Sequence, residues 1–431
     1  MKEKYLTNAR IIDPKNDLDE MGGLIIDSKG HIKAVGKKVA NGNLPSSVEK
    51  IDLKKQILIP GIVDMRVFVG EPGYEYKENF RTLSSAALAG GVTSVVSMPN
   101  TSPVIDNVSM VDFLKRRGRD KSQINIFPAA TLTKNALGKQ MTEFGLLKRK
   151  GIIAFTDGIR TVQDPEVMSR IMNFASQSES LIMQHAEDNI LSKDGLINEG
   201  EISTRLGLKG IPFLAEKIIV ERDLSFLEEY FCRYHISQIS SEKTIAVIKK
   251  AKKEGKIFTT GVSINNLSLN ENDIGDFKTF LKLSPPLRTE NDRKALVDSV
   301  NDGTIDVIVS DHKPQDEESK RLTFSQAATG ASGVETLLPL ALELFHNKSI
   351  KLEKLIESIT SNPAKILGIK KGCLDKGNDA DLCIFDINKP WVVDKTKLKS
   401  KSKNTPIEDR KLQGQVLKTF VKGELAYEIN N

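Results

Sequence analysis

Short apolar runs alternate with longer amphipathic segments along most of the chain, beginning near Leu58. Eight apolar runs are each followed by a segment with helical spacing, which predicts eight β-then-α units. The expected strands cover 58–69, 92–98, 124–130, 151–156, 180–185, 234–239, 256–262 and 305–311. The expected helices cover 78–90, 108–119, 143–150, 165–178, 212–230, 241–254, 290–301 and 334–346.

This alternation places the chain in the α/β class, with a parallel sheet. Several expected strands are almost entirely apolar, such as Val307-Ile308-Val309, as in strands that are covered on both faces. Parallel strands at this spacing also occur in open doubly wound sheets. The count of eight strands, and the β segments on both sides of them, favour a closed (β/α)8 barrel of the TIM type.

Both ends of the chain have a different pattern from the middle. Short β-like runs separated by turn residues fill the first 55 or so residues, and similar runs return after about residue 365. We expect the two ends to pair into a small β-sandwich domain, which gives domains of 1–56, 57–365 and 366–431. The segment 395–403, KTKLKSKSK, is expected to be a flexible, solvated basic loop.

Composition excludes several classes of protein. The chain has 431 residues, 39% of them hydrophobic, and a formal net charge of +6, which suits one large barrel with an accessory module. The positive charge is spread along the chain without a basic, aromatic-rich stripe, so we expect no nucleic-acid partner. No apolar run approaches the roughly 18 residues of a membrane span, and the N-terminal segment has no apolar core of a signal peptide.

The three cysteines, Cys232, Cys373 and Cys383, form no CxxC pair. This pattern argues against a disulfide scaffold or a thiolate zinc site, and it suits a reducing compartment. We therefore expect a cytoplasmic protein that does not contact membranes.

In a barrel of this kind, reactive side chains lie where strands end and βα loops begin. The fourth, fifth and eighth expected strands end at Asp157, His185 and Asp311, which are residue types that bind catalytic zinc. The first strand instead places Arg66 and Phe68 on one face. Neither side chain can donate a lone pair to a metal, and Arg66 would repel one.

The chain resembles the longer (class I) dihydroorotases of the amidohydrolase superfamily over nearly its whole length. The resemblance rests on the order and spacing of short motifs: Glu71-Pro72-Gly73, Gly90-Gly91-Val92-Thr93, Met98-Pro99-Asn100-Thr101, Phe155-Thr156-Asp157-Gly158, His185-Ala186-Glu187-Asp188, Tyr234-His235-Ile236-Ser237, Ser284-Pro285-Pro286-Leu287-Arg288, Asp302-Gly303-Thr304-Ile305-Asp306 and Asp311-His312. It implies an amidohydrolase barrel with a two-metal site.

The family pattern at the first strand is D-x-H-x-H-x-R-E-P-G, and this chain departs from it. Both histidines are replaced, by Arg66 and Phe68, and the substrate-binding arginine by Gly70. Gln238 occupies the position of the strand-six metal ligand, and Gln315 occupies the position of the histidine expected after strand eight.

The resemblance leaves a residual set of site residues. Asp157, His185 and Asp311 are the remaining metal positions, with Asp311 the catalytic proton carrier in an active member. Asn100 and Arg288 are the remaining substrate-binding candidates. Asp311 could equally form an ion pair with Arg66.

The sequence leaves open whether the chain is an enzyme. The favoured interpretation, implied by the resemblance, is a catalytically inactive dihydroorotase-like protein of de novo pyrimidine (UMP) biosynthesis, with no cofactor. Such a protein would form a homo-oligomer and act as a structural partner of aspartate transcarbamoylase. The alternative is an active but divergent dihydroorotase, hydantoinase or allantoinase that hydrolyses a cyclic amide with one zinc. A third possibility is a small-ligand sensor in which Arg66 binds an anion.

Overall fold

The computed structural model describes residues 2–40 and 48–429. Within these, eight parallel strands follow one another in the order β15-β14-β13-β10-β9-β8-β7-β6. Their bounds are β6 (Ile62–Val67), β7 (Val92–Ser97), β8 (Asn125–Ala130), β9 (Ala154–Phe155), β10 (Leu181–Gln184), β13 (Arg233–Ile236), β14 (Thr259–Ser263) and β15 (Val307–Val309). The expected eight-stranded parallel barrel is confirmed.

The first and last strands meet just beyond their carboxyl ends, which almost closes the barrel. Val67 and His312 form a parallel β-bridge, and the Phe68 amide donates to the His312 carbonyl at 2.8 Å. This closure brings the tips of β6 and β15 together, although they are separated by some 240 residues of sequence.

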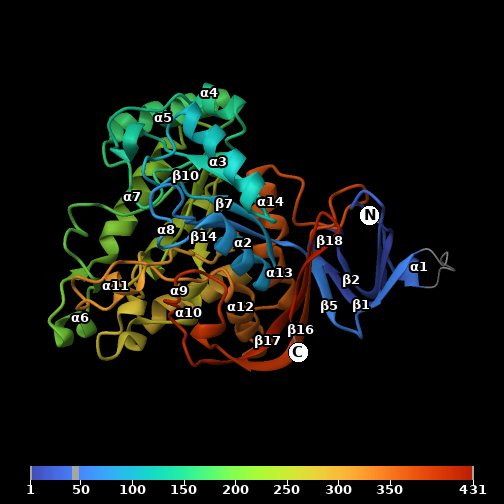
Figure 1. Cartoon of the computed structure of the whole chain (residues 1–431). Coiled ribbons are helices and arrows are strands. Elements are labelled where there is room, and N and C mark those ends of the chain that lie inside the picture. Colours follow the sequence, from blue (N-terminus) through green and yellow to red (C-terminus); the bar gives the residue numbers. More distant parts are fainter. Residues whose placement is uncertain (1, 41–47, 430–431) are drawn as a thin grey trace.

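Helices surround the barrel, as Figure 1 shows. The helices that follow the strands are α2 (Phe80–Ala89), α3 (Val108–Lys121), α4 (Phe144–Arg149), α5 (Pro165–Ser178), α7 (Phe213–Phe226), α8 (Glu242–Lys253), α10 (Glu290–Asn301) and α12 (Leu337–His346). Each lies within an expected helix or extends it by at most two residues. Two further helices, α13 (Leu352–Ile359) and α14 (Ser361–Leu367), follow before the chain leaves the barrel.

Several short helices and strands lie in the segments that connect these elements. They are α1 (Lys37–Ala40), α6 (Glu201–Leu206), α9 (Ile264–Ser268), α11 (Glu317–Lys320), β11 (Ile197–Asn198) and β12 (Gly210–Ile211). Of the described helices, none combines the length and apolar character needed to cross a membrane. The three cysteines are buried and free.

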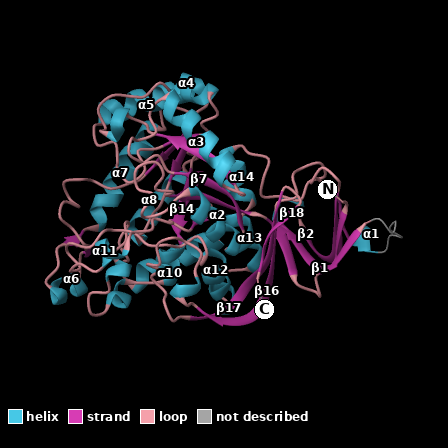
Figure 2. Ribbon diagram, in the orientation of Figure 1, coloured by secondary structure: helices cyan, strands magenta, loops and turns pink. Residues whose placement is uncertain are grey.

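Strands from both termini form a second sheet beside the barrel (Figure 2). Its order is β18-β17-β16-β5-β1-β2-β3, with β4 paired to β1. The bounds are β1 (Lys4–Asp13), β2 (Leu18–Ile26), β3 (Ile32–Gly36), β4 (Glu49–Asp52), β5 (Ile57–Pro60), β16 (Leu382–Val392), β17 (Lys411–Val421) and β18 (Glu424–Glu428). The union of the two termini is therefore confirmed, and it has its own apolar core around Leu6, Ile26, Leu58 and Phe420.

The expected strand 58–69 is in fact two strands in two different sheets. β5 pairs with β16 and β1 in the terminal sheet, and β6 begins two residues later in the barrel. Gly61 separates them, and a Cβ at this position would lie only 2.1 Å from Thr93 Oγ1. The chain thus passes from one sheet to the other through a point where only glycine fits.

The basic segment 395–403, which we call the strap, is not a solvated loop. Leu398, Ser400 and Ser402 are buried. The Ser400 hydroxyl donates to the fully buried carboxylate of Glu78 at 2.5 Å, and the backbone amides of Lys399 and Ser400 donate to Glu335. The expectation of a solvated loop was wrong for these residues: Glu78 holds Ser400, the Lys77 carbonyl holds Ser402, and the half-buried Glu335 holds the backbone, while the lysines Lys397, Lys399 and Lys401 stay exposed.

Candidate functional site at the barrel mouth

The predicted site residues lie at the carboxyl ends of four barrel strands. Arg66 is the penultimate residue of β6, His185 directly follows β10, and Asp157 and Asp311 come two residues after the ends of β9 and β15. All four side chains are buried. The barrel topology thus gathers them at one end, the end where αβ-barrel enzymes carry their chemistry.

Arg66 and Asp311 form a buried ion pair at this end. Arg66 Nε lies 3.1 Å from Asp311 Oδ1, and Arg66 Nη2 donates to the Gly158 carbonyl at 3.2 Å. The guanidinium carbon is 5.4 Å from the centre of the Phe68 ring, within cation–π range. A positive charge therefore occupies the side of the mouth where the family pattern has two histidines.

The ion pair balances the electrostatic cost of burial. Burial raises the pKa of Asp311, and the positive charge of Arg66 opposes that rise. Burial likewise lowers the pKa of Arg66, and Asp311 opposes it. Asp311 has a backbone φ of +50°, a left-handed conformation that aspartate and asparagine tolerate better than other side-chain-bearing residues.

Asp157 is held by Thr133 rather than directed at a ligand. Its Oδ1 accepts from the Thr133 amide at 3.0 Å, and its Oδ2 from the Thr133 hydroxyl at 2.5 Å. Burial raises the pKa of Asp157 to about 6, although both bonds from Thr133 lower it. Both carboxylate oxygens are thus engaged in bracing the loop after β8.

His185 contributes a neutral imidazole. Burial lowers its pKa well below the usual value, and the positive charges of Arg66 and Lys313 lower it further. Nε2 lies 3.5 Å from Ser284 Oγ and 3.9 Å from a Glu187 carboxylate oxygen. Nδ1 is buried and has no hydrogen-bond partner among the described residues.

The residues present do not fit the metal centre that the family implies. Among residues 2–40 and 48–429, no three His, Cys, Asp or Glu side chains gather as metal ligands do. Asp157, His185 and Asp311 are therefore not a ligand cluster: Thr133 holds the first, and Arg66 neutralises the last. Gln238, at the strand-six position, is buried and offers only an amide.

The two predicted substrate-binding residues are bonded to the protein itself. Asn100 Nδ2 donates to the Asp157 carbonyl at 3.0 Å, and its Oδ1 accepts from the Ile159 amide at 3.2 Å. Arg288 is buried and donates to Ser240 Oγ at 2.7 Å and Asn198 Oδ1 at 2.8 Å. Asn100 thus braces a loop at the mouth, and Arg288 cross-links neighbouring loops.

A cavity of about 280 Å³ opens at the mouth, and we call it the mouth pocket. It is lined by loops that follow β6, β7, β8, β9 and β15, and its residues include Phe68, Lys77, Arg160, Lys313 and Gln315. Neither Lys313 nor Arg160 was singled out from the sequence. The position of Lys313, two residues after Asp311 at the tip of the last strand, was the available signal.

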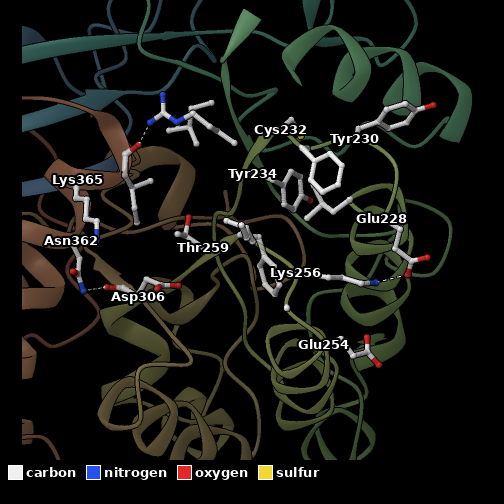
Figure 3. A pocket seen from close by; sticks show the side chains of 18 residues that line it. Glu228, Tyr230, Cys232, Tyr234, Glu254, Lys256, Thr259, Asp306, Asn362 and Lys365 are labelled. Carbon is white, nitrogen blue, oxygen red and sulfur yellow. Dashed lines mark hydrogen bonds and ion pairs between the residues drawn. The ribbon is translucent and has the colours of Figure 1, made fainter. Parts of the chain in front are cut away.

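A larger hollow of about 700 Å³ lies at the opposite end of the barrel (Figure 3). It is lined by residues at the amino ends of β10, β13, β14 and β15, with Phe231 and Ile257 strongly exposed beside it. Lys256 pairs with Glu228 at 2.6 Å, as Figure 3 shows, and Asp306 pairs with Lys252 at 3.0 Å. This hollow carries no cluster of groups suited to catalysis.

Full-length relatives exist among known proteins. The chain is 41% identical over 423 residues to "Dihydroorotase" of Syntrophus aciditrophicus, covering 98% of this chain and 99% of the relative. It is also 41% identical to "Dihydroorotase" of Ehrlichia canis, covering 97% and 94%. The profile of the family described as "Dihydro-orotase-like" matches residues 55–244.

Solved structures agree on the fold. The L-hydantoinase (dihydropyrimidinase) of Arthrobacter aurescens superposes with a TM-score of 0.89 over 99% of this chain and 96% of that one, at 23% identity. The dihydropyrimidinase of Brevibacillus agri gives 0.85 over 99% and 95%, at 19% identity. At these low identities, the structural similarity supports only the fold, that is, the barrel and its terminal sheet. The full-length relatives decide the family: the chain is a dihydroorotase-like member of the amidohydrolase superfamily.

Proposed function

We propose that this chain is a non-catalytic dihydroorotase homologue of pyrimidine biosynthesis. The observation that carries the proposal is the buried pair of Arg66 and Asp311. It stands where members of the family place the first-strand histidines and the strand-eight aspartate of a metal site.

The chemistry of the family explains why this pair matters. A bound metal ion lowers the pKa of a water molecule to near neutrality and polarises the carbonyl that is attacked. Arg66 cannot ligate a metal, and a divalent ion near its fixed charge would be repelled by several kcal/mol at roughly 4 Å and an effective dielectric of about 20. Asp311, already paired with Arg66, is not free to shuttle the proton of an attacking water.

The role that remains is a structural one. The barrel, its helices and the terminal sheet are complete, so the outer surface can serve assembly even where the mouth does not serve hydrolysis. By resemblance to metal-depleted homologues, we propose that the chain forms a homo-oligomer and associates with aspartate transcarbamoylase.

An active but divergent enzyme is the second candidate. It is favoured by the full-length relatives named "Dihydroorotase" at 41% identity. In that case, one zinc held through His185 would have to displace Arg66 from Asp311.

Two measurements on the same purified protein separate the candidates. The protein is equilibrated with zinc, freed of unbound ion, and assayed by elemental mass spectrometry and for ring opening of dihydroorotate. The proposal predicts far less than one zinc per chain and no turnover above a heat-denatured control. One zinc per chain together with turnover, both abolished in His185→Ala, would establish the enzyme.

The structural role needs its own test. The chain and the aspartate transcarbamoylase of the same genome are expressed together and separately, then compared by size-exclusion chromatography with light scattering. We expect one co-eluting complex and a carbamoyl-transfer activity that depends on this chain. Separate elution, with full transcarbamoylase activity alone, would refute the partnership.

A further inference from the structure

We propose that the hollow at the opposite end of the barrel from the mouth docks an acidic, apolar segment of a partner protein. We call this surface the base hollow, and its volume is about 700 Å³. Such a contact rests on the structural role proposed above. It concerns the surface that this role uses and the chemistry of the segment that binds there, whichever protein supplies it.

The floor of the base hollow is apolar. Buried Leu181, Leu227 and Phe258 lie in its lining, near the amino ends of strands β10, β13 and β14. The volume is within the range of about 300–1,000 Å³ that is typical of sites for organic groups. The floor therefore has room for one or two apolar side chains of another protein.

Two large apolar side chains at the rim of the base hollow are exposed to solvent. Phe231 is 84% exposed and Ile257 is 85% exposed, and both line the hollow. They precede two adjacent strands, since β13 and β14 pair in parallel from His235 with Thr259. Burying such a side chain fully contributes about 1.5–3 kcal/mol. A small molecule inside the hollow would leave much of both side chains in water, so the rim favours a larger occupant.

The charged groups of the lining are unevenly paired. Arg233 and Lys365 are both exposed and take part in no ion pair among the described residues. Arg233 donates to the Ile366 carbonyl, which places it beside Lys365, and Figure 3 shows Lys365 across the hollow from Lys256. Each carboxylate of the lining already has a lysine of this chain, at 2.6, 3.0 and 3.8 Å: Glu228 with Lys256, Asp306 with Lys252, and Glu254 with Lys250.

This pairing selects the charge of the occupant. An Asp or Glu of a partner placed beside Arg233 and Lys365 would form charge-assisted hydrogen bonds, and the arginine fork binds a carboxylate with two parallel bonds. A two-fold contact between two copies of this chain would bring the same cations against carboxylates that are already paired. The formal net charge of +6 opposes self-association as well. The surface is therefore complementary to an acidic partner rather than to a second copy.

A library of random dodecapeptides displayed on phage, selected on the immobilised full-length protein, tests the inference. We expect the enriched peptides to combine Asp or Glu with aromatic or large aliphatic residues. One enriched peptide is then synthesised and titrated calorimetrically. Lys365→Glu should weaken its binding about tenfold or more, because an attractive charge becomes a repulsive one at an exposed position.

A matched pair of variants tests the apolar contact. Ile257→Ser removes an apolar side chain at the rim of the base hollow, and we expect a severalfold loss of affinity for the peptide. Ile190→Ser makes the same change at an isoleucine that is 83% exposed, in the loop after β10 at the mouth end of the barrel. This control should bind the peptide as the parent does.

Several outcomes would overturn the inference. They are no enrichment of any peptide, enriched peptides without acidic residues, and equal affinity of the peptide for the parent, Lys365→Glu and Ile257→Ser. Octanoate is the probe for a small-molecule site, and octanoate that binds more tightly than the peptide would also overturn the docking of a protein segment.

The proposed function fails or stands by a different result. A complex with the transcarbamoylase, together with no peptide enrichment, would refute this inference alone. Separate elution of the transcarbamoylase, together with enrichment of acidic peptides that Lys365→Glu no longer binds, would refute that partnership and leave the base hollow as a docking surface.

Discussion

Arg66 Nε lies 3.1 Å from Asp311 Oδ1, although the two residues are 245 positions apart. The contact joins the tips of the first and last barrel strands, beside the backbone bridge between Val67 and His312. The ion pair therefore helps to close the barrel, and under the proposed function it also places a positive charge where the family has metal ligands. Its structural and chemical consequences can be tested separately.

Removing only the arginine should destabilise the fold strongly. Arg66→Met leaves Asp311 buried without its partner, which typically costs about 3–5 kcal/mol. The double variant Arg66→Met, Asp311→Asn removes both charges, and asparagine tolerates the left-handed backbone there. We expect it to recover most of the loss in urea unfolding. A loss below about 1 kcal/mol in the single variant, typical of surface pairs, would contradict this account.

Asp157 should behave as a structural residue whose partner is Thr133. Thr133→Val keeps the shape of the side chain but removes the hydroxyl that donates to Asp157 Oδ2. Hydrogen bonds to charged groups contribute about 1.5–3 kcal/mol, and we expect a loss of this size in the free energy of unfolding. Thr133→Ser restores the hydroxyl and is the control. Unchanged stability in Thr133→Val would mean that Asp157 is free for another role.

The sequence predicted the barrel well because each βα unit carries its own signal. The apolar strands and amphipathic helices lie within a few residues of their expected positions, and the replacement of two ligand histidines by Arg66 and Phe68 was visible directly. The pairing of Arg66 with Asp311 was one of several alternatives, since only barrel closure decides which strand tips meet.

Other features depend on contacts that no local pattern encodes. The apolar run 58–69 does not reveal that Gly61 divides it between two sheets. The strap looks solvated by composition, but Glu78 binds the Ser400 hydroxyl and Glu335 binds the backbone amides of Lys399 and Ser400. Lys313 drew no attention because only the folded mouth brings it over the Phe68 ring and into the lining of the mouth pocket.

Asp64 should make the stability depend on pH. It is fully buried, its Oδ1 accepts from the Arg66 amide at 3.1 Å, and its Oδ2 has no partner. Burial raises its pKa to about 6, compared with about 3.9 in an unfolded chain. The folded protein therefore binds this proton more tightly than the unfolded chain does. The neutral acid contributes its full stability below about pH 4, and this contribution is lost as the pH rises to about 6 and above.

Asp64→Asn should remove this dependence. Two pKa units correspond to about 3 kcal/mol, so the variant should gain roughly that much stability relative to the parent between pH 4 and pH 7, and no more above pH 7. Urea unfolding of both proteins across this range measures the difference. Parallel stability curves would show that Asp64 remains ionised, or protonated, throughout.

The strap should open when its contact with Glu78 is removed. Ser400→Ala deletes the hydroxyl that donates to Glu78 Oε2 and leaves this oxygen only the longer bond from the Lys401 amide at 3.2 Å, at a cost of about 1–3 kcal/mol. This hydrogen bond exists only when the strap is closed, so its loss lowers the free energy needed to open the strap locally. A loss of about 1.4 kcal/mol corresponds to opening that is tenfold more frequent. Hydrogen exchange of the amides of 395–403 should accelerate accordingly. Lys397→Ala, whose side chain is 84% exposed, is the matched control, and equal exchange in the two variants would show that Ser400 does not hold the strap.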